Sequence, residues 1–297
     1  MKTKNKIYPD FYLLGAAKCG TTSVAATLKK HPEIFIPSQK ELHVFDNDKN
    51  YNNGKKHYTN YFSDAGEKLK ADCTPSYFHS SIRVRDRIAN IATGREKYVV
   101  IIRDPVERAY SHYLHLTRAR FLDESFMDLF KKNMSCISDE GKWVNIYSDG
   151  LYAVQLSHWF EAFEQRDFLI VLTEELKENP KKTLQRIYNH LGVDETLDLD
   201  IVTKNTQSHA RSKYIRNLTT SNNALKRSVS KIIPLKIKSK IMYGVRKLNV
   251  KKSNVVSSLT DECSSQEIRF LYSAYKQDIG NLESMLGWKN TGWVHEE

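Results

Sequence analysis

The sequence has few cysteines and no long apolar run, and both absences limit what the protein can be. Its 297 residues include four cysteines, which lie far apart and never in a Cys-x-x-Cys spacing. We interpret them as reduced thiols rather than a disulfide framework, which predicts a cytoplasmic protein. No stretch approaches the roughly 18 consecutive apolar residues that a membrane-spanning helix needs. The N-terminal segment carries lysines but lacks the apolar core of a secretory signal, which favours the same location.

Acidic residues are missing from one long segment. Between residues 201 and 260 there are 14 lysines and arginines and no aspartate or glutamate. The chain as a whole has a net charge of +11, so the remaining residues carry −3 (32 basic minus 35 acidic residues). This pattern favours an anionic partner such as a nucleotide phosphate, an acidic glycan or an anionic lipid surface, although a solvated lysine-rich surface would share it. No helix-turn-helix or aromatic stacking platform is evident, so nucleic acid is not expected as a partner.

Apolar residues are plentiful enough for a large core, at 40% of the chain. Continuous apolar runs predict buried strands at 11–14, 34–36, 98–102 and 168–172. Helical patterns alternate with them at 21–30, 106–120, 151–163, 181–191 and 266–286. This alternation predicts an α/β fold, a three-layer sandwich with a central parallel sheet flanked by helices. Ligands of such sheets bind at the carboxyl ends of the strands, so the loops after Leu14 and Ile102 are expected at one shared edge.

We interpret the whole chain, 1–297, as a single domain with a basic helical insertion at about 218–252. Pro234 interrupts the helical pieces of this insertion. Isoleucines and leucines alternate there with lysines, as they do in helices that lie on membrane surfaces. Peripheral association with an anionic membrane, or with an acidic acceptor, is therefore expected as an addition to the main function.

The first chemical motif follows the first strand and reads Gly-Ala-Ala-Lys-Cys-Gly-Thr-Thr at 15–22. Glycines and a helix N-terminus together favour a P-loop-like phosphate-binding loop, although tight strand–helix turns also need glycine for steric reasons. Nucleotide triphosphatases and kinases have the same glycine spacing with a lysine after the second glycine. Here that position is Thr21, the lysine is Lys18, and no convincing magnesium-binding acid follows. A nucleotide kinase or triphosphatase remains the alternative enzyme class, and a protein that only binds membrane surfaces or anionic polymers is the alternative of another class.

A second motif, Ile-Arg-Asp-Pro-Val-Glu-Arg-Ala-Tyr-Ser-His-Tyr, follows at 102–113. With the first motif, it resembles the sulfotransferases that use 3′-phosphoadenosine 5′-phosphosulfate (PAPS), in the branch of the Golgi heparan sulfate sulfotransferases and their bacterial relatives. The resemblance implies that Arg103 and Ser111 bind the 3′-phosphate of PAPS. It makes Arg211 and Lys213 candidates for a further PAPS-binding cation. It also implies a 5′-phosphosulfate loop formed by Lys18, Cys19, Gly20, Thr21, Thr22 and Ser23. The alternative for Arg103 is a surface ion pair with Asp104 or Glu107.

Two further segments are similar to the same branch: Lys-Glu-Leu-His-Val-Phe-Asp at 40–46 and Asp-Cys-Thr-Pro-Ser-Tyr-Phe at 72–78. The resemblance implies in-line sulfonate transfer without a metal, with Lys18 and Glu41 as catalytic residues and 3′,5′-adenosine bisphosphate as product. A carboxylate base works best when partial burial raises its pKa toward neutrality. His43 competes with Glu41 for the role of base. The alternative for Glu41 is a solvated ion pair with Lys40.

The sequence also departs from that branch. Cys73 stands where the animal enzymes have a lysine, and their cysteine-bridged loop is missing. The acceptor is therefore expected to be a hydroxyl or amine, in a glycan or glycolipid, without a closer identity. Contacts to it are expected from His43, Tyr77, Tyr152 and His158. His112 and His115 have the spacing of two metal ligands on a helix, but no third ligand is nearby in the sequence, so no metal site is expected.

Overall fold

The computed structural model describes residues 8–120, 124–136, 145–202 and 258–293, and two strands of two residues each, β6 (His209–Ala210) and β7 (Val250–Lys251), which pair antiparallel. Arg211 and Lys213 lie outside the described residues. So does the predicted basic insertion at about 218–252, apart from β7.

The centre of the molecule is a five-stranded sheet with the order β2-β3-β1-β4-β5, in which every neighbouring pair is parallel. Its strands are β1 (Phe11–Gly15), β2 (Ile34–Phe35), β3 (Leu69–Asp72), β4 (Lys97–Ile102) and β5 (Phe168–Leu172). All five residues of β1 are buried, and so are five of the six in β4. Strands covered on both faces lose the polar–apolar alternation, which explains why these runs are continuously apolar.

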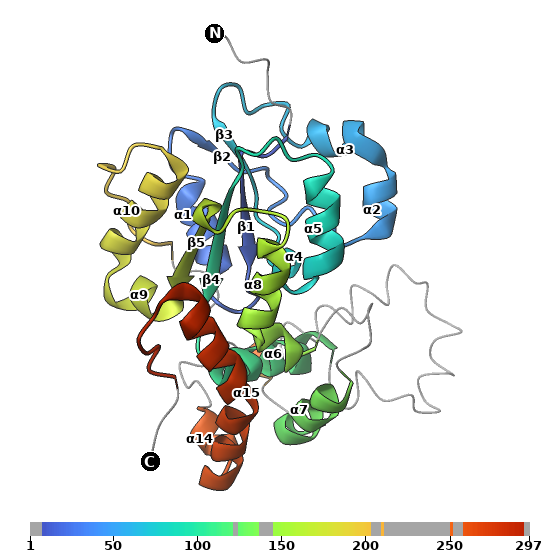
Figure 1. The fold of residues 1–297 in the computed structure, drawn as a ribbon, viewed down its shortest axis with the longest axis vertical. Coiled ribbons are helices and arrows are strands. Elements are labelled where there is room, and N and C mark those ends of the chain that lie inside the picture. The colour runs from blue at the N-terminus through green and yellow to red at the C-terminus, as the bar shows by residue number, and fades with distance from the viewer. Residues whose placement is uncertain are drawn as a thin grey trace.

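Helices cover both faces of the sheet (Figure 1). On one side lie α1 (Thr21–Leu28), α9 (Thr173–Glu178) and α10 (Pro180–Leu191), and on the other α4 (Ser76–His79), α5 (Ser81–Ala89) and α8 (Tyr152–Phe160). Two short helices, α2 (Asp48–Asn52) and α3 (Gly54–Asn60), connect β2 to β3, and the 3-10 turns η1 (Ser148–Gly150) and η2 (Gln165–Asp167) flank α8. The predicted three-layer α/β architecture is confirmed.

An aromatic ladder joins three strands on the face covered by α8. Tyr98 on β4 stacks on its register partner Tyr12 of β1, with ring centroids 5.8 Å apart, and on its partner Phe168 of β5 at 4.6 Å. Trp159 of α8 packs against both Tyr98 and Phe168. All four rings are buried, so this ladder is a main source of hydrophobic stabilisation between the sheet and α8.

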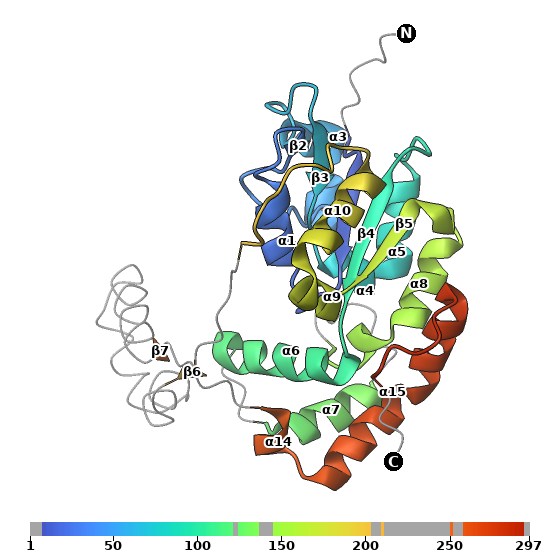
Figure 2. The same cartoon turned by 90° about the vertical axis from the view of Figure 1, so that its left-hand side faces the viewer.

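A second group of helices lies beyond the carboxyl ends of the strands (Figure 2). It contains α6 (Pro105–Arg120), α7 (Phe126–Ser135), α14 (Leu259–Glu262) and α15 (Ser265–Leu286). Asp104 joins α6 to α15, because one of its carboxylate oxygens accepts bonds from the Val106 and Glu107 amides and the other accepts the Tyr272 hydroxyl at 2.9 Å. Within the described part of the chain, no helix has the length and apolar character needed to cross a bilayer.

Candidate functional site

The loop between β1 and α1 is shaped by its two glycines. A Cβ atom at Gly15 would lie 2.6 Å from Cβ of Phe78 and 2.8 Å from the carbonyl oxygen of Pro75, so a larger residue cannot be placed there without a backbone shift. Gly20 has a φ of 91° and precedes α1 without a side-chain cap. The Ser23 amide is 3.0 Å from the Gly20 carbonyl oxygen. The Thr21 and Thr22 amides come before the first hydrogen-bonded turn of the helix, so they are placed to donate to an anion. No acidic side chain lies in the first turn of α1 to repel one.

The remaining loop residues divide into supporting and accessible ones. Cys19 is fully buried with its Sγ 3.9 Å from the Tyr152 hydroxyl, and burial raises its thiol pKa to about 11. It therefore remains a neutral packing residue rather than a reactive thiolate. Thr21 is buried, whereas Lys18 and Thr22 are half-buried, and the Thr22 hydroxyl accepts a bond from Nζ of Lys40 at 3.2 Å. Ser23 is half-buried in the first turn of α1.

The loop after β4 lies beside the first loop, as the sequence predicts. The Thr173 hydroxyl is 2.9 Å from the Cys19 carbonyl oxygen and 3.0 Å from that of Ile102, so it connects the two loops. Arg103 follows Ile102, and its own carbonyl accepts the Tyr152 hydroxyl at 2.8 Å. Its guanidinium forms an ion pair with Glu107 at 2.8 Å, which is the pairing expected under the alternative interpretation. Ser111 is half-buried on α6, eight residues after Arg103.

A chain of polar contacts runs from the first loop to the segment after β2. Nζ of Lys40, besides its bond to Thr22, is 2.9 Å from Oε1 of Glu41. Oε2 of Glu41 is 3.6 Å from Nε2 of His43, and the other ring nitrogen of His43 is 2.9 Å from Oδ2 of Asp46. The Ser76 hydroxyl donates a hydrogen bond to the same Asp46 oxygen. Glu41 therefore lies between two cationic groups, within reach of the phosphate-binding loop through Lys40.

These contacts set the charges in the cluster. Hydrogen bonds to Asp46 and then to Glu41 raise the pKa of His43 to about 10. The pKa of Glu41 is lowered to about 2, first by the bond to His43 and then by Lys40, although burial acts in the opposite direction. At neutral pH the pair is therefore a carboxylate and an imidazolium. The condition under which a carboxylate base works best, a pKa raised by burial, is not met here, because the two cations outweigh the desolvation.

The family follows from a comparison of the sequence with known families. The model of the sulfotransferase domain matches residues 8–241. The chain belongs to the sulfotransferase family. The predicted family is therefore confirmed, and the parallel sheet flanked by helices confirms the predicted fold class.

Curated relatives agree with this assignment. Human heparan sulfate glucosamine 3-O-sulfotransferase 3B1 is 30% identical over 192 residues, which are 64% of this chain and 47% of the relative. Human carbohydrate sulfotransferase 15 is 23% identical over 272 residues, covering 71% of this chain and 48% of that protein. The chain thus spans about half the length of these curated relatives.

Solved structures show the same fold. A sulfotransferase from Alicyclobacillus acidocaldarius superposes with a TM-score of 0.68 at 21% identity, covering 96% of this chain and 98% of that one. Mouse sulfotransferase SULT7A1, complexed with PAP, gives 0.51 at 17% identity, covering 94% of this chain and 89% of that one.

The sulfotransferase fold corrects two of the expected acceptor contacts. Tyr77 and Tyr152 are both fully buried, and their hydroxyls are used within the protein, so neither is available to an acceptor. His158 lies in the last turn of α8, about 9 Å along the helix axis from Tyr152. Of the four expected contacts, His43 is the one that lies in the Glu41 cluster.

His112 and His115 have different surroundings. His115 is exposed, whereas His112 is buried with Nδ1 3.3 Å from the Arg108 guanidinium and 3.5 Å from Asp149. Burial and then the Arg108 charge hold the pKa of His112 well below its usual range, so its ring is neutral. Among the described residues, no group of three or more His, Cys, Asp or Glu side chains is arranged to hold a metal ion.

Sequence reasoning missed several residues that complete the site. Lys40 entered only as a possible ion-pair partner of Glu41, yet it also reaches Thr22. Asp46 pairs with His43, and the only signal for this pair in the sequence is that Asp46 follows three residues after His43. Thr173 carried no local signal, because only the pairing of β4 with β5 brings it to the two loops.

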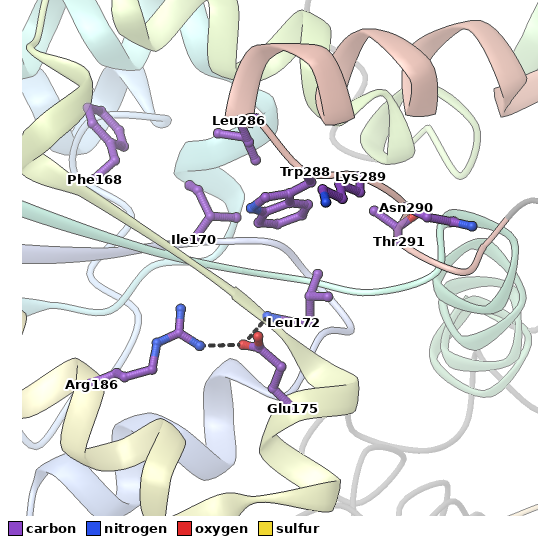
Figure 3. A pocket seen from close by; sticks show the side chains of 11 residues that line it. Phe168, Ile170, Leu172, Glu175, Arg186, Leu286, Trp288, Lys289, Asn290 and Thr291 are labelled. Atoms are coloured by element: carbon purple, nitrogen blue, oxygen red, sulfur yellow. Dashed lines mark hydrogen bonds and ion pairs between the residues drawn. The ribbon is translucent and has the colours of Figure 1, made fainter.

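A groove of about 540 Å³ lies elsewhere, along the outer side of the edge strand β5 (Figure 3). Trp288 lies near Ile170 on one side of the strand, and Arg186 forms an ion pair with Glu175 on the other side. None of the predicted site residues lines this groove, so the site is built at the loops and not here.

Proposed function

We propose that this sulfotransferase domain moves a sulfonate group from PAPS to a hydroxyl or amine of a glycan or glycolipid. The observation that carries the proposal is the connection between the two halves of the site. The uncapped N-terminus of α1, which includes Thr22, is suited to bind phosphate. Nζ of Lys40 contacts both the Thr22 hydroxyl and the ionised Glu41. The names of the relatives support the acceptor class, since they state heparan sulfate glucosamine and carbohydrate as what those proteins sulfate.

The residues of the two loops fit the donor. The α1 amides, Lys18 and Thr22 would hold the 5′-phosphosulfate, and Arg103 with Ser111 would hold the 3′-phosphate. The neighbour solved with PAP supports a donor of this class. The donor supplies an already activated sulfonate, so the protein has to orient it, stabilise its charge and remove the acceptor proton.

Glu41 is the group that accepts that proton. Its carboxylate is ionised at neutral pH, whereas His43 is already protonated and has no lone pair to offer. As the acceptor oxygen or nitrogen forms its bond to sulfur, its proton passes to Glu41 and the bond between sulfur and the phosphate oxygen breaks. Lys18 and the loop amides stabilise the charge left on the phosphate.

Lys40 answers the objection that a carboxylate of pKa about 2 is a weak base. Its ammonium is 2.9 Å from Glu41 and 3.2 Å from the Thr22 hydroxyl, so an anion bound at the loop competes with Glu41 for this charge. Donor binding therefore raises the Glu41 pKa and makes the carboxylate a stronger base when it is needed.

The test is transfer from sulfur-labelled PAPS to fractionated glycans and lipids by the purified chain. We expect label in a glycan or glycolipid fraction with wild type, and a loss of at least about 100-fold in kcat with Glu41→Gln. Label in no fraction, together with magnesium-dependent ATP hydrolysis, would favour a kinase or triphosphatase instead.

A further inference from the structure

Asp72, at the end of β3, is a buried carboxylate whose described hydrogen-bond partners are hydroxyl groups. Its side chain is inaccessible to water. Oδ1 accepts the Thr74 hydroxyl at 2.6 Å, and Oδ2 accepts the hydroxyls of Tyr58 and Tyr77, each at 3.0 Å. Burial raises the Asp72 pKa to about 6, while the three hydroxyl bonds act to lower it.

Two of these hydroxyls also contact the segment that carries Glu41 and His43. The Thr74 hydroxyl accepts the Leu42 amide at 2.9 Å. The Tyr77 hydroxyl accepts the amides of Val44 at 3.0 Å and Phe45 at 3.4 Å. An ionised carboxylate can only accept hydrogen bonds, so the Thr74 and Tyr77 hydroxyls each donate their one hydrogen bond to Asp72. The lone pairs of the two hydroxyl oxygens therefore remain for the amides of the 42–45 segment.

The anchored amides bracket a strained position. His43 has a φ of 49°, in the left-handed region that non-glycine residues rarely adopt. Leu42, Val44 and Phe45 are buried on either side of it, whereas Glu41 and His43 remain partly exposed. The bonds at residues 42, 44 and 45 therefore hold a turn that directs both polar side chains away from the core.

We propose that Asp72 is a positioning residue for the transfer reaction: through Thr74 and Tyr77 it holds residues 42–45 so that Glu41 and His43 keep their geometry beside the phosphate-binding loop. This inference rests on the proposed function for its catalytic meaning. The geometry on which it depends can also be measured without turnover.

The decisive comparison is between Tyr77→Phe and Tyr58→Phe. Each change removes one buried hydroxyl that lies 3.0 Å from the same Asp72 oxygen, but only the Tyr77 hydroxyl reaches the 42–45 segment. We expect Tyr77→Phe to lower kcat by about tenfold or more with an unchanged KM for PAPS, and Tyr58→Phe to stay within about twofold of wild type. Tyr77→Phe should also lose more unfolding stability than Tyr58→Phe, because it leaves the amides of Val44 and Phe45 without this acceptor. Stability alone therefore does not separate positioning from general loosening, and a turnover-independent readout is needed.

Thr74 gives an independent pair of variants. Thr74→Val has the same shape without the hydroxyl, and we expect it to lower kcat in the same way as Tyr77→Phe. Thr74→Ser keeps the hydroxyl between Asp72 and the Leu42 amide, so it should retain most of the wild-type kcat.

The His43 ring provides the readout that does not need turnover. Its pKa of about 10 depends on contacts with Asp46 and Glu41, so a loosened segment should move it toward the ordinary value of 6.5. NMR titration should show this fall in Tyr77→Phe and no change in Tyr58→Phe. Equal loss of kcat in both tyrosine variants, or an unmoved His43 titration in Tyr77→Phe, would overturn the inference. If wild type transfers no sulfonate, the proposed function fails, and the titration alone decides the positioning.

Discussion

Glu41 and His43 have charges that no local pattern in the sequence reveals. The motif placed both residues near the donor loop, but the direction of their pKa shifts depends on Lys40 and Asp46. Sequence spacing shows that such groups are close along the chain. It does not show that His43 adopts a left-handed turn and contacts carboxylates on both sides. Electrostatics at this scale therefore had to come from the structure.

The pH dependence of turnover separates the two candidate bases. Because the Glu41 pKa is lowered to about 2, its carboxylate persists throughout the acid range, and kcat/KM should show no loss attributable to its protonation between about pH 5 and 8. With Glu41 as the base, turnover does not require a neutral His43, so kcat/KM should not climb steadily with pH toward the His43 pKa of about 10. A rate that instead increases with pH up to about 10 would identify neutral His43 as the base.

The main strands and helices were predictable from periodicity. The helix expected at 266–286 is α15 (Ser265–Leu286), and that expected at 181–191 is α10 (Pro180–Leu191). β3 (Leu69–Asp72) was missed because only two of its four residues are buried, so its sequence has no continuous apolar run. The position of β3 beside β1 is what brings Asp72 and Thr74 below the Glu41 segment.

Glycine substitutions should have opposite effects in two elements. Gly15→Ala forces a Cβ into backbone and side-chain atoms at 2.6–2.8 Å, so it should cost about 1–3 kcal/mol of unfolding free energy and weaken donor binding. Gly280 lies within α15 with open space around it, and Gly280→Ala should stabilise by about 0.5–1 kcal/mol. Chemical denaturation measures both, and a neutral Gly15→Ala would contradict the loop geometry described here.

The start of α8 depends on a residue from α15. The two carboxylate oxygens of Asp278 accept the Ala153 amide at 3.1 Å and the Val154 amide at 3.2 Å, and so cap α8. Asp278→Ala should therefore lower the unfolding free energy by about 1–2 kcal/mol. The neighbouring Gln277 is exposed, and Gln277→Ala should be nearly neutral by the same measurement. Equal costs for the two variants would remove the capping role.

At the scale of the whole molecule, the parallel sheet brings three distant segments to one edge. The loop after β1, the loop after β4 and Thr173 after β5 meet there, although they span more than 150 residues of sequence. The sequence predicted the first two at a shared edge, since parallel strands end on the same side. The strand order that adds Thr173 could not be predicted from local patterns. Placement of the whole chain in one domain stays a prediction, as does a membrane role for the basic segment.

Donor binding at the two loops can be measured directly by calorimetric titration of the purified chain with 3′,5′-adenosine bisphosphate. Arg103 and Arg166 are each ion-paired with a glutamate at 2.8 Å, but Arg166 is a highly exposed residue of η2, away from the two loops. We predict binding by wild type, a loss of about tenfold or more in affinity for Lys18→Ala and for Arg103→Ala, and unchanged affinity for Arg166→Ala. No binding by wild type, or equal affinity for all three variants, would contradict donor binding at the two loops.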